Sequence, residues 1–452
     1  MVQGPMLLVI LLAGIALIVL MISKFKIHPF LSLILVAFGM AFAAKMPLKD
    51  IASTITGGFG TLLGNIGIVI VLGTIIGYIL EKSGAALKMA DVVVRIVGQK
   101  RPALAMTIIG YIVSIPVFCD SGFVILNSLR KALKKRTNAS SIAMTVALAT
   151  GLYSTHTLVP PTPGPIAAAA NLGMDNNLLL IIALGALVAI PTALSGYFYA
   201  HWIGKRIKSE EDMSETSETY EELLKSYGTL PNAFKSFAPI ISPIIAMALG
   251  SIAAFPGAPF GKGIFKDYMV FIGTPINALF IGFFFSLLLL PKFNEETLNN
   301  WISEALKSAS IILLVTGAGG SLGAVLKATK IADYLGTSLA SYNIGIFLPF
   351  IIAAALKTAQ GSSTVSLVTT SAILAPLLPA LGFTSEMARA LVVMAIGAGA
   401  MTVSHANDSY FWVVSQFGGM KVSDAYKAQT MATLVMGVVT ILFVFVLSLV
   451  LI

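Results

Sequence analysis

The apolar segments of this chain are too long and too numerous to be hidden in a water-soluble fold. Residues 5–22 carry no charge, and about 20 apolar residues span the hydrocarbon core of a bilayer. Further segments of similar length follow at once, so this one is interpreted as a transmembrane helix and not as a cleaved signal peptide. The chain is 57% hydrophobic and 11% charged, whereas a soluble domain has about 25% charged residues. The sequence therefore predicts an all-α polytopic membrane protein.

Apolar segments divide the chain into two halves. They cover residues 5–22, 28–44, 62–80, 102–133, 139–170, 178–202, 233–254, 268–290, 306–326, 343–381, 387–418 and 427–452. The long polar stretch at 205–231 holds seven of the 20 acidic residues. We expect it to be a cytoplasmic connector between a first half, residues 1–204, and a second half, residues 232–452.

One segment in each half has a polar, helix-breaking centre. Segment 102–133 is interrupted by Pro116-Val117-Phe118-Cys119-Asp120-Ser121-Gly122, and segment 343–381 by Gln360-Gly361-Ser362-Ser363-Thr364. Two short apolar arms around such a centre are typical of a re-entrant hairpin, whose tip is tolerated where protein or water surrounds it. The sequence therefore predicts two re-entrant hairpins.

The segment that follows each hairpin is also broken. Segment 139–170 contains four prolines within residues 160–165, and segment 387–418 contains Ser404-His405-Ala406-Asn407-Asp408-Ser409. Proline removes a backbone donor and interrupts a helix. Both halves thus show the same order of spans, hairpin, broken span and last span. Five crossings per half would invert the second half relative to the first, which is the layout of many secondary transporters.

The basic residues give this topology an orientation. With about ten transmembrane helices and the N-terminus outside, 21 of the 29 Lys and Arg residues fall in inside loops and seven in outside loops. Such a bias follows the positive-inside rule. Fourteen crossings would place the loops on the same sides, and the shortness of the hairpin arms favours ten.

Composition excludes several other classes of protein. The net charge of +9 is explained by the inside loops, so we expect no nucleic-acid partner. A single cysteine, Cys119, excludes a disulfide framework. We find no zinc spacing, phosphate-binding loop or metalloprotease motif, so we expect no cofactor, no metal and no enzyme activity.

Two acidic residues are candidates for a function at membrane depth, where a carboxylate costs about 2.5–3.5 kcal/mol on insertion scales. Asp120 and Asp408 both lie at helix interruptions. Either could simply cap a short helix. We favour a proton-coupling role for Asp120 and leave the two interpretations of Asp408 open.

Three basic or titratable side chains accompany them. His156 and His405 occupy equivalent places in the two broken segments, and imidazole can bind an anion or relay a proton near neutral pH. Each could equally be a hydrogen-bonded packing residue. Lys357 lies in the middle of an apolar arm. It could extend to the membrane surface, or it could pair with a substrate carboxylate or an acidic neighbour.

The hairpin tips supply a different means of binding an anion. Helices that begin at Ser121-Gly122 and at Ser362-Ser363-Thr364 would expose free N–H groups and a positive dipole end beside hydroxyl groups. This combination binds carboxylates. Gly and Ser are also what a tight turn requires, but two tips at matching places favour a shared site.

Five stretches of the sequence resemble the gluconate:proton symporter (GntP) family of the ion-transporter superfamily. They are residues 57–84, IPVFCDSGFVIL at 115–126, HTLVPPTPGPIAA at 156–168, AQGSSTV at 359–365 and SHANDSYFW at 404–412. The resemblance implies proton-driven uptake of gluconate or a related sugar acid, with idonate, fructuronate and D-serine as substrates of similar proteins. It further implies hairpin tips around the substrate, a homodimer and an inner-membrane location among lipids.

The resulting hypothesis is a proton-coupled symporter for a small hydroxy-carboxylate. The expected substrate-binding residues are Ser121, Gly122, His156, Thr162, Lys357, Ser362, Ser363, Thr364, His405 and Asn407, with Asp120 and Asp408 in proton coupling. A D-serine symporter and a sodium-coupled carboxylate transporter remain alternatives.

Overall fold

The computed structural model describes residues 2, 5–97, 101–137, 139–209, 229–253, 261, 263–329, 345–405 and 408–452. Every regular element in these ranges is a helix. Five of the described helices are long and apolar enough to cross a membrane, or up to seven if each bent pair is one span. The protein is therefore a polytopic helical membrane protein, as the sequence predicts. Ten crossings and two inverted halves stay predictions, and most of the 205–231 connector lies outside the described residues.

The first half begins with a helical pair and one long helix. Its helices are α1 (Pro5–Ser23), α2 (Pro29–Ala43), α3 (Leu48–Lys82), α4 (Ala85–Val97), α5 (Pro102–Val113), α6 (Cys119–Thr137), α7 (Ser141–Leu158), α8 (Pro163–Asn171) and α9 (Leu178–Ile203). Helix α3 begins 14 residues before the expected segment 62–80 and bends by 48° between Asn65 and Gly67.

The second half contains α11 (Ala233–Ala253), α12 (Ile264–Gly273), α13 (Pro275–Leu287), α14 (Trp301–Ala328), α16 (Phe347–Gln360), α17 (Ser363–Leu374), α18 (Glu386–Met401), α19 (Ser409–Phe417), α20 (Val422–Ala425) and α21 (Met431–Leu451). The expected span 268–290 is two helices that meet at 72°. Thr274 has extended backbone angles, because a residue before proline avoids the helical region.

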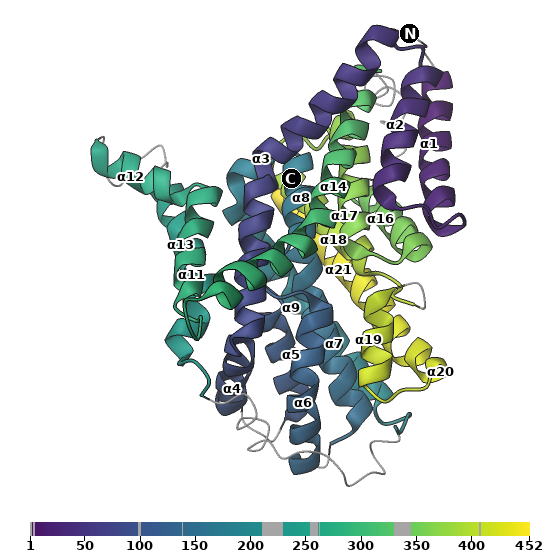
Figure 1. Ribbon diagram of the computed structural model, residues 1–452. Coiled ribbons are helices and arrows are strands. Elements are labelled where there is room, and N and C mark those ends of the chain that lie inside the picture. The colour runs from purple at the N-terminus through teal and green to yellow at the C-terminus, as the bar shows by residue number, and fades with distance from the viewer. Residues whose placement is uncertain are drawn as a thin grey trace.

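Helix α3 runs obliquely through the molecule and crosses α14, while α11, α12 and α13 project to one side (Figure 1). At the crossing, a Cβ atom on Gly58 would lie 2.5 Å from the carbonyl oxygen of Gly320. Small residues let two membrane helices approach until their backbones touch. Farther along α3, a Cβ on Gly73 would lie 2.9 Å from the Pro161 carbonyl oxygen, and one on Gly77 would collide with that of Pro116. Glycine thus brings α3 against two interruptions of the first half.

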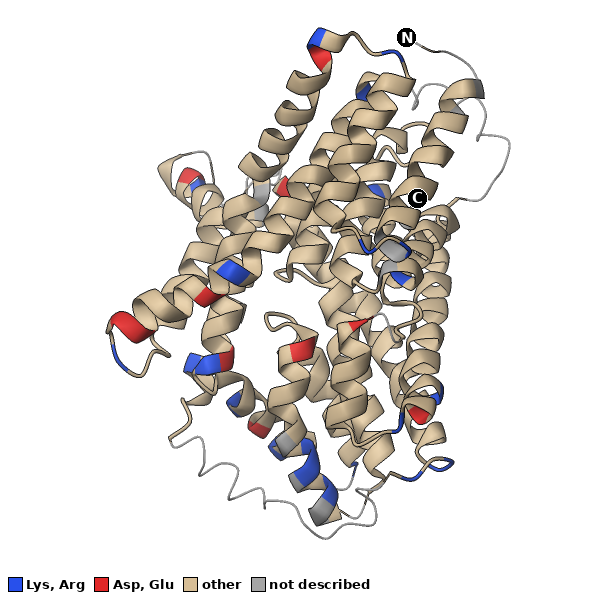
Figure 2. Ribbon diagram, turned by 45° about the vertical axis from the view of Figure 1, so that its right-hand side comes forward, with Lys and Arg blue, Asp and Glu red and all other residues tan. Residues whose placement is uncertain are grey.

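The charged residues lie mainly toward the ends of the helices. Figure 2 shows the largest group of Lys and Arg at the lower end of the molecule, far from the N-terminus, and long stretches of uncharged helix between the ends. Distribution of this kind is expected for helices that cross a hydrocarbon layer.

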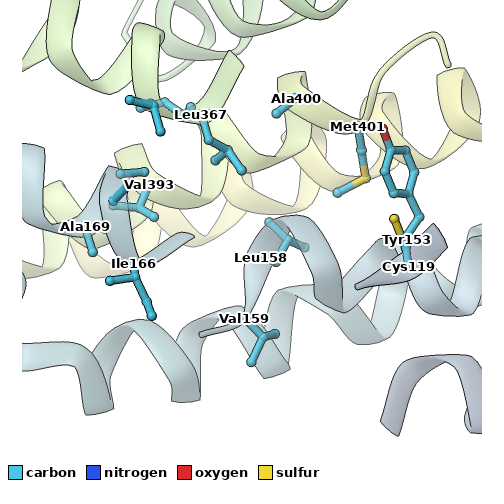
Figure 3. Packing of buried hydrophobic residues seen from close by; sticks show 14 of the residues in the cluster. Cys119, Tyr153, Leu158, Val159, Ile166, Ala169, Leu367, Val393, Ala400 and Met401 are labelled. Carbon is cyan, nitrogen blue, oxygen red and sulfur yellow. The ribbon is translucent and has the colours of Figure 1, made fainter. Parts of the chain in front are cut away.

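The apolar core draws on both halves of the chain. Ile166 and Ala169 on α8 belong to the same buried cluster as Leu367 on α17 and Val393 on α18, and Figure 3 shows them with Met401 and Tyr153. The interruptions described below are therefore held in a packed interior, where irregular backbone is tolerated.

Candidate functional site

Four helix interruptions lie in the interior of the described structure. They separate α5 from α6 at residues 114–118, α7 from α8 at 159–162, α16 from α17 at 361–362, and α18 from α19 at 402–405 and Asp408. Proline lies in the first two interruptions, and Gly361 in the third has a φ of 90°. The fourth contains neither residue type, and there Val403 has a φ of 60°.

Side-chain contacts join these interruptions. The Ser409 hydroxyl donates to Asp120 over 3.4 Å, which links the first tip to the second broken segment. The Tyr153 hydroxyl lies 2.7 Å from the hydroxyl of Ser363, which links the first broken segment to the second tip. A Cβ on Gly164 would lie 3.6 Å from the Thr364 Cα. Residues separated by 200 or more positions thus form one polar region.

Helices α6, α8, α17 and α19 all begin in this region. The first N–H groups of a helix have no partner within it, and its dipole is positive at that end. Some of these donors are already used or missing: α8 begins with Pro163-Gly164-Pro165, in which only Gly164 has an N–H, and side chains accept the Val365 N–H of α17 and the Tyr410 N–H of α19. The remaining donors and the four positive dipole ends favour an anion without requiring an unpaired basic side chain.

A buried ion pair holds the second half together. The Lys357 ammonium lies 2.6 Å from Asp408 Oδ2 and also donates to the Gly361 carbonyl. The Ser404 hydroxyl donates to the same Asp408 oxygen, while Asp408 Oδ1 accepts from the Tyr410 N–H at the start of α19. Lys357 is fully buried, so it does not extend to the membrane surface. Asp408 therefore both caps α19 and forms an ion pair with Lys357.

Asp120 has a much weaker set of contacts. Besides the Ser409 hydroxyl, it accepts the Cys119 thiol over a long 3.9 Å, and none of the described Lys or Arg residues forms an ion pair with it. Glu81, in the last turn of α3, is a further acidic residue that the sequence analysis does not single out. Asp120 is therefore a carboxyl group without a fixed countercharge.

The two histidines also differ in whether their ring nitrogens have hydrogen-bond partners. His156 is buried, with its ring centre 6.0 Å from that of Phe118 and 6.4 Å from that of Tyr153. Its Nδ1 has no hydrogen-bond partner in the described structure. His405 Nε2 instead lies 2.9 Å from the Thr358 carbonyl oxygen. Buried polar atoms nearly always find a partner, so an unpaired His156 nitrogen marks a place where a ligand could supply one.

Other expected site residues have local roles in the structure. The Thr162 hydroxyl donates to the carbonyls of His156 and Val159 at the end of α7. Ser362 accepts the Val365 N–H as the cap of α17. Gly122 lies in the first turns of α6, where a Cβ would meet the Leu152 side chain at 2.9 Å. Asn407 lies outside the described residues.

Sequence reasoning missed two residues that organise the region. Tyr153 lies three residues before His156 on α7, and its ring is 5.0 Å from that of Tyr410 and 5.6 Å from the Lys357 ammonium. The three-residue spacing places it on the same helical face as His156. Arg130 lies in the basic run at the end of segment 102–133, yet it is fully buried and donates to Asn127 and Ser141 over 2.7 Å.

Comparisons with solved structures identify related folds. Neisseria gonorrhoeae MtrF, described as one of a class of antimetabolite efflux pumps, superimposes with a TM-score of 0.67 over 95% of this chain and 97% of its own, at 16% identity. The Alcanivorax borkumensis YdaH transporter gives 0.62 over 88% of each chain, at 15% identity. At such identities the likeness shows the fold alone.

Sequence comparisons are more specific. A gluconate permease of Zymomonas mobilis is 33% identical over 98% of both chains, and the D-serine transporter DsdX of Escherichia coli K12 is 33% identical over 97% of both. An uncharacterized permease of Haemophilus influenzae is 34% identical over 91% of this chain and 85% of its own. The model of the GntP family permeases matches residues 6–450, and the chain belongs to this family of transporters.

Proposed function

We propose that the protein is a secondary active transporter that takes up gluconate or a related sugar acid together with a proton. One observation carries the substrate class: four helices begin around a region that also contains the unpaired nitrogen of buried His156. Free N–H groups and an imidazole bind a carboxylate and its neighbouring hydroxyls. The gluconate permeases among its relatives support the sugar acid.

The anion would lie between the two hairpin tips. Ser121, Gly122, Ser363 and Thr364 provide helix N-termini and hydroxyls, and His156 provides a ring nitrogen. Thr162 and Ser362 shape the site as helix caps. Lys357 contributes through its pair with Asp408, which neutralises it, while His405 and Asn407 belong to the neighbouring broken segment.

Asp120 is the proposed proton carrier. It lies at the start of α6 beside the site and has no fixed countercharge among the described residues. A carboxyl group in this position can cross neutral when protonated, whereas an ionised one is costly at membrane depth. Asp408 lacks this freedom because Lys357 and Ser404 hold its carboxylate.

The proposed topology is that predicted from the sequence. It has ten crossings, two re-entrant hairpins at 102–133 and 343–381, broken spans at 139–170 and 387–418, and halves of opposite orientation in the cytoplasmic membrane. A homodimer is part of the same proposal, as an implication of the family. The paired contacts between interruptions of the two halves support a single shared site.

D-serine is a second candidate substrate. The relative DsdX is named for it, and the Asp120 carboxylate, which has no ion-pair partner among the described residues, could accept an ammonium group as well as a proton. In that case Asp120 would be a substrate ligand. The two functions therefore differ in what Asp120 does.

Counterflow in proteoliposomes tests the proposal. Vesicles loaded with unlabelled gluconate should take up labelled gluconate, and excess D-serine should not compete. Net uptake should stop with a protonophore and be indifferent to sodium. Competition by D-serine alone would favour the second candidate, sodium dependence would contradict proton coupling, and no exchange of any carboxylate would overturn the proposal.

A further inference from the structure

A second polar space lies away from the helix interruptions. A cavity of about 670 Å³ lies between α3 and α14 on one side and α8 and α17 on the other. Its polar lining consists of Thr61, Asn65, Asn171 and Lys327. Pockets for small ligands have volumes of roughly 300–1,000 Å³, so a sugar acid fits within it.

Lys327 is the only charged residue among the described residues that line this cavity. Its side chain is exposed, and its ammonium has no hydrogen bond or ion pair within the described structure. An ammonium with three unused donors facing a cavity is suited to a carboxylate.

Helices α8, α14 and α17 end at the cavity, and helix C-termini repel anions. Several of the last carbonyls of α8 and α14, however, have a donor. The Thr329 hydroxyl donates to the carbonyls of Val325 and Leu326, and the N–H groups of Gly173 and Met174 donate to those of Ala170 and Ala169. Lys327 is left as the group that can attract an anion into the cavity.

The cavity lies at a defined distance from the proposed site. Asn171 is eight residues beyond Pro163 at the start of α8, and Ala372 is nine beyond Ser363 in α17. On α3, Asn65 is eight residues before Gly73, and Gly73 contacts Pro161 of the first broken segment. At 1.5 Å per residue, α8 and α17 give an offset of roughly 12–14 Å along their axes.

We propose that this cavity is an outer vestibule in which Lys327 binds the substrate carboxylate before it reaches the hairpin tips. The inference rests on the proposed function and on the orientation that places Lys327 outside. Association is faster when a cleft carries charge opposite to that of the ligand. The competing explanation is that Lys327 only balances the dipole of α14, in which case its removal would affect stability and not entry.

Initial rates of gluconate uptake into right-side-out vesicles separate these explanations. Lys327→Gln should raise KM about three- to tenfold, leave kcat nearly unchanged and flatten the salt dependence of kcat/KM. Lys327→Arg should keep the wild-type values, and Lys327→Glu should be more impaired than Gln. The control is Lys266→Gln on α12, which removes a charge outside the cavity lining and should leave KM unchanged.

Thiol labelling gives a readout that does not require transport. In Asn65→Cys, an anionic methanethiosulfonate added outside should react faster than a cationic one, and adding Lys327→Gln should abolish this preference. The parent chain serves as the blank, because its single cysteine is buried. Unchanged KM, salt dependence and labelling preference in active Lys327→Gln would overturn the vestibule. A wild-type protein that exchanges no carboxylate would instead overturn the proposed function.

Discussion

The equivalent positions of the two halves differ in how far their hydrogen bonds are satisfied. In the first half, His156 has an unpaired ring nitrogen and Asp120 has only a long contact to Ser409 and a thiol. In the second half, His405 contacts a carbonyl oxygen and Asp408 is held by Lys357 and Ser404. The sequence predicts the same order of elements in both halves, yet the hydrogen bonds of these residues are complete in the second half and incomplete in the first.

This difference indicates that the residues compared have different roles in the two halves. A group whose bonds are complete without a ligand gains little from binding one, whereas an unpaired buried group gains a full hydrogen bond. We therefore expect substitutions of Asp120 and His156 to alter coupling and binding. Substitutions of Asp408, His405 or Lys357 should mainly alter the stability of the fold.

The largest effect is expected from replacing Asp120, which tests its role in proton coupling. Asp120→Asn keeps the shape and hydrogen-bonding capacity of the side chain but cannot release a proton. Gluconate counterflow should continue, while uptake driven by a pH gradient should reach equilibrium without accumulation. Asp267→Asn on α12, remote from the interruptions, is the control. Accumulation by Asp120→Asn would remove Asp120 from the coupling mechanism.

The next effect tests stability in the second half. Lys357→Met leaves the Asp408 carboxylate buried without its cation, and breaking such a pair costs about 3–5 kcal/mol. Thermal unfolding of the purified protein should show this loss. Combining Lys357→Met with Asp408→Leu should recover much of it, because an apolar pair replaces both charges. A single variant as stable as the wild type would refute the structural role of the pair.

The histidines provide a matched comparison. His156→Phe keeps an aromatic ring between Phe118 and Tyr153 but removes the unpaired nitrogen, so it should weaken gluconate binding about ten- to 100-fold, as for a hydrogen bond to a charged group. His405→Phe loses one bond to a carbonyl and should mainly lower stability, by about 1 kcal/mol. Calorimetric titration and thermal unfolding measure the two effects. Equal losses of affinity would erase the distinction between the halves.

The smallest effect concerns the contact between the halves. Tyr153→Phe removes the hydrogen bond to Ser363 and should cost about 0.5–1.5 kcal/mol of stability with a modest loss of affinity. Tyr199→Phe removes a bond to the Lys427 carbonyl away from the site and should lower stability only. Both are measured by unfolding and titration. If Tyr199→Phe reduced the affinity for gluconate as much as Tyr153→Phe does, Tyr153 would have no specific role in substrate binding.

The sequence predicts the helix interruptions well because their causes are local. Proline near residue 160 and Gly361 stop helices through their own backbone restrictions. Thr274-Pro275 carries the same signal, and the break between α12 and α13 could have been expected there. The all-helical membrane fold follows equally directly from the apolar segments.

The partners of charged side chains could not be predicted, because they depend on tertiary packing. Lys357 and Asp408 are 51 residues apart, and nothing local shows that α16 brings the ammonium to the start of α19. Arg130 lies in a basic run that resembles a loop, yet packing against α7 buries it. The three-residue spacing between Tyr153 and His156 places both on one helical face, which the sequence can predict. The hydrogen bond from Tyr153 to Ser363 depends on how the two halves pack against each other.

The neutral Lys357–Asp408 pair also bears on the electrical driving force. Because its two charges cancel, the proposed carrier would move one negative charge when empty, on ionised Asp120. It would also move one when loaded, on the substrate anion beside protonated Asp120. A single charge moving through 100 mV is worth about 2.3 kcal/mol, but equal charges in the two directions give no net current. A cycle built on this pair would be insensitive to membrane voltage and would draw its energy from the pH gradient alone.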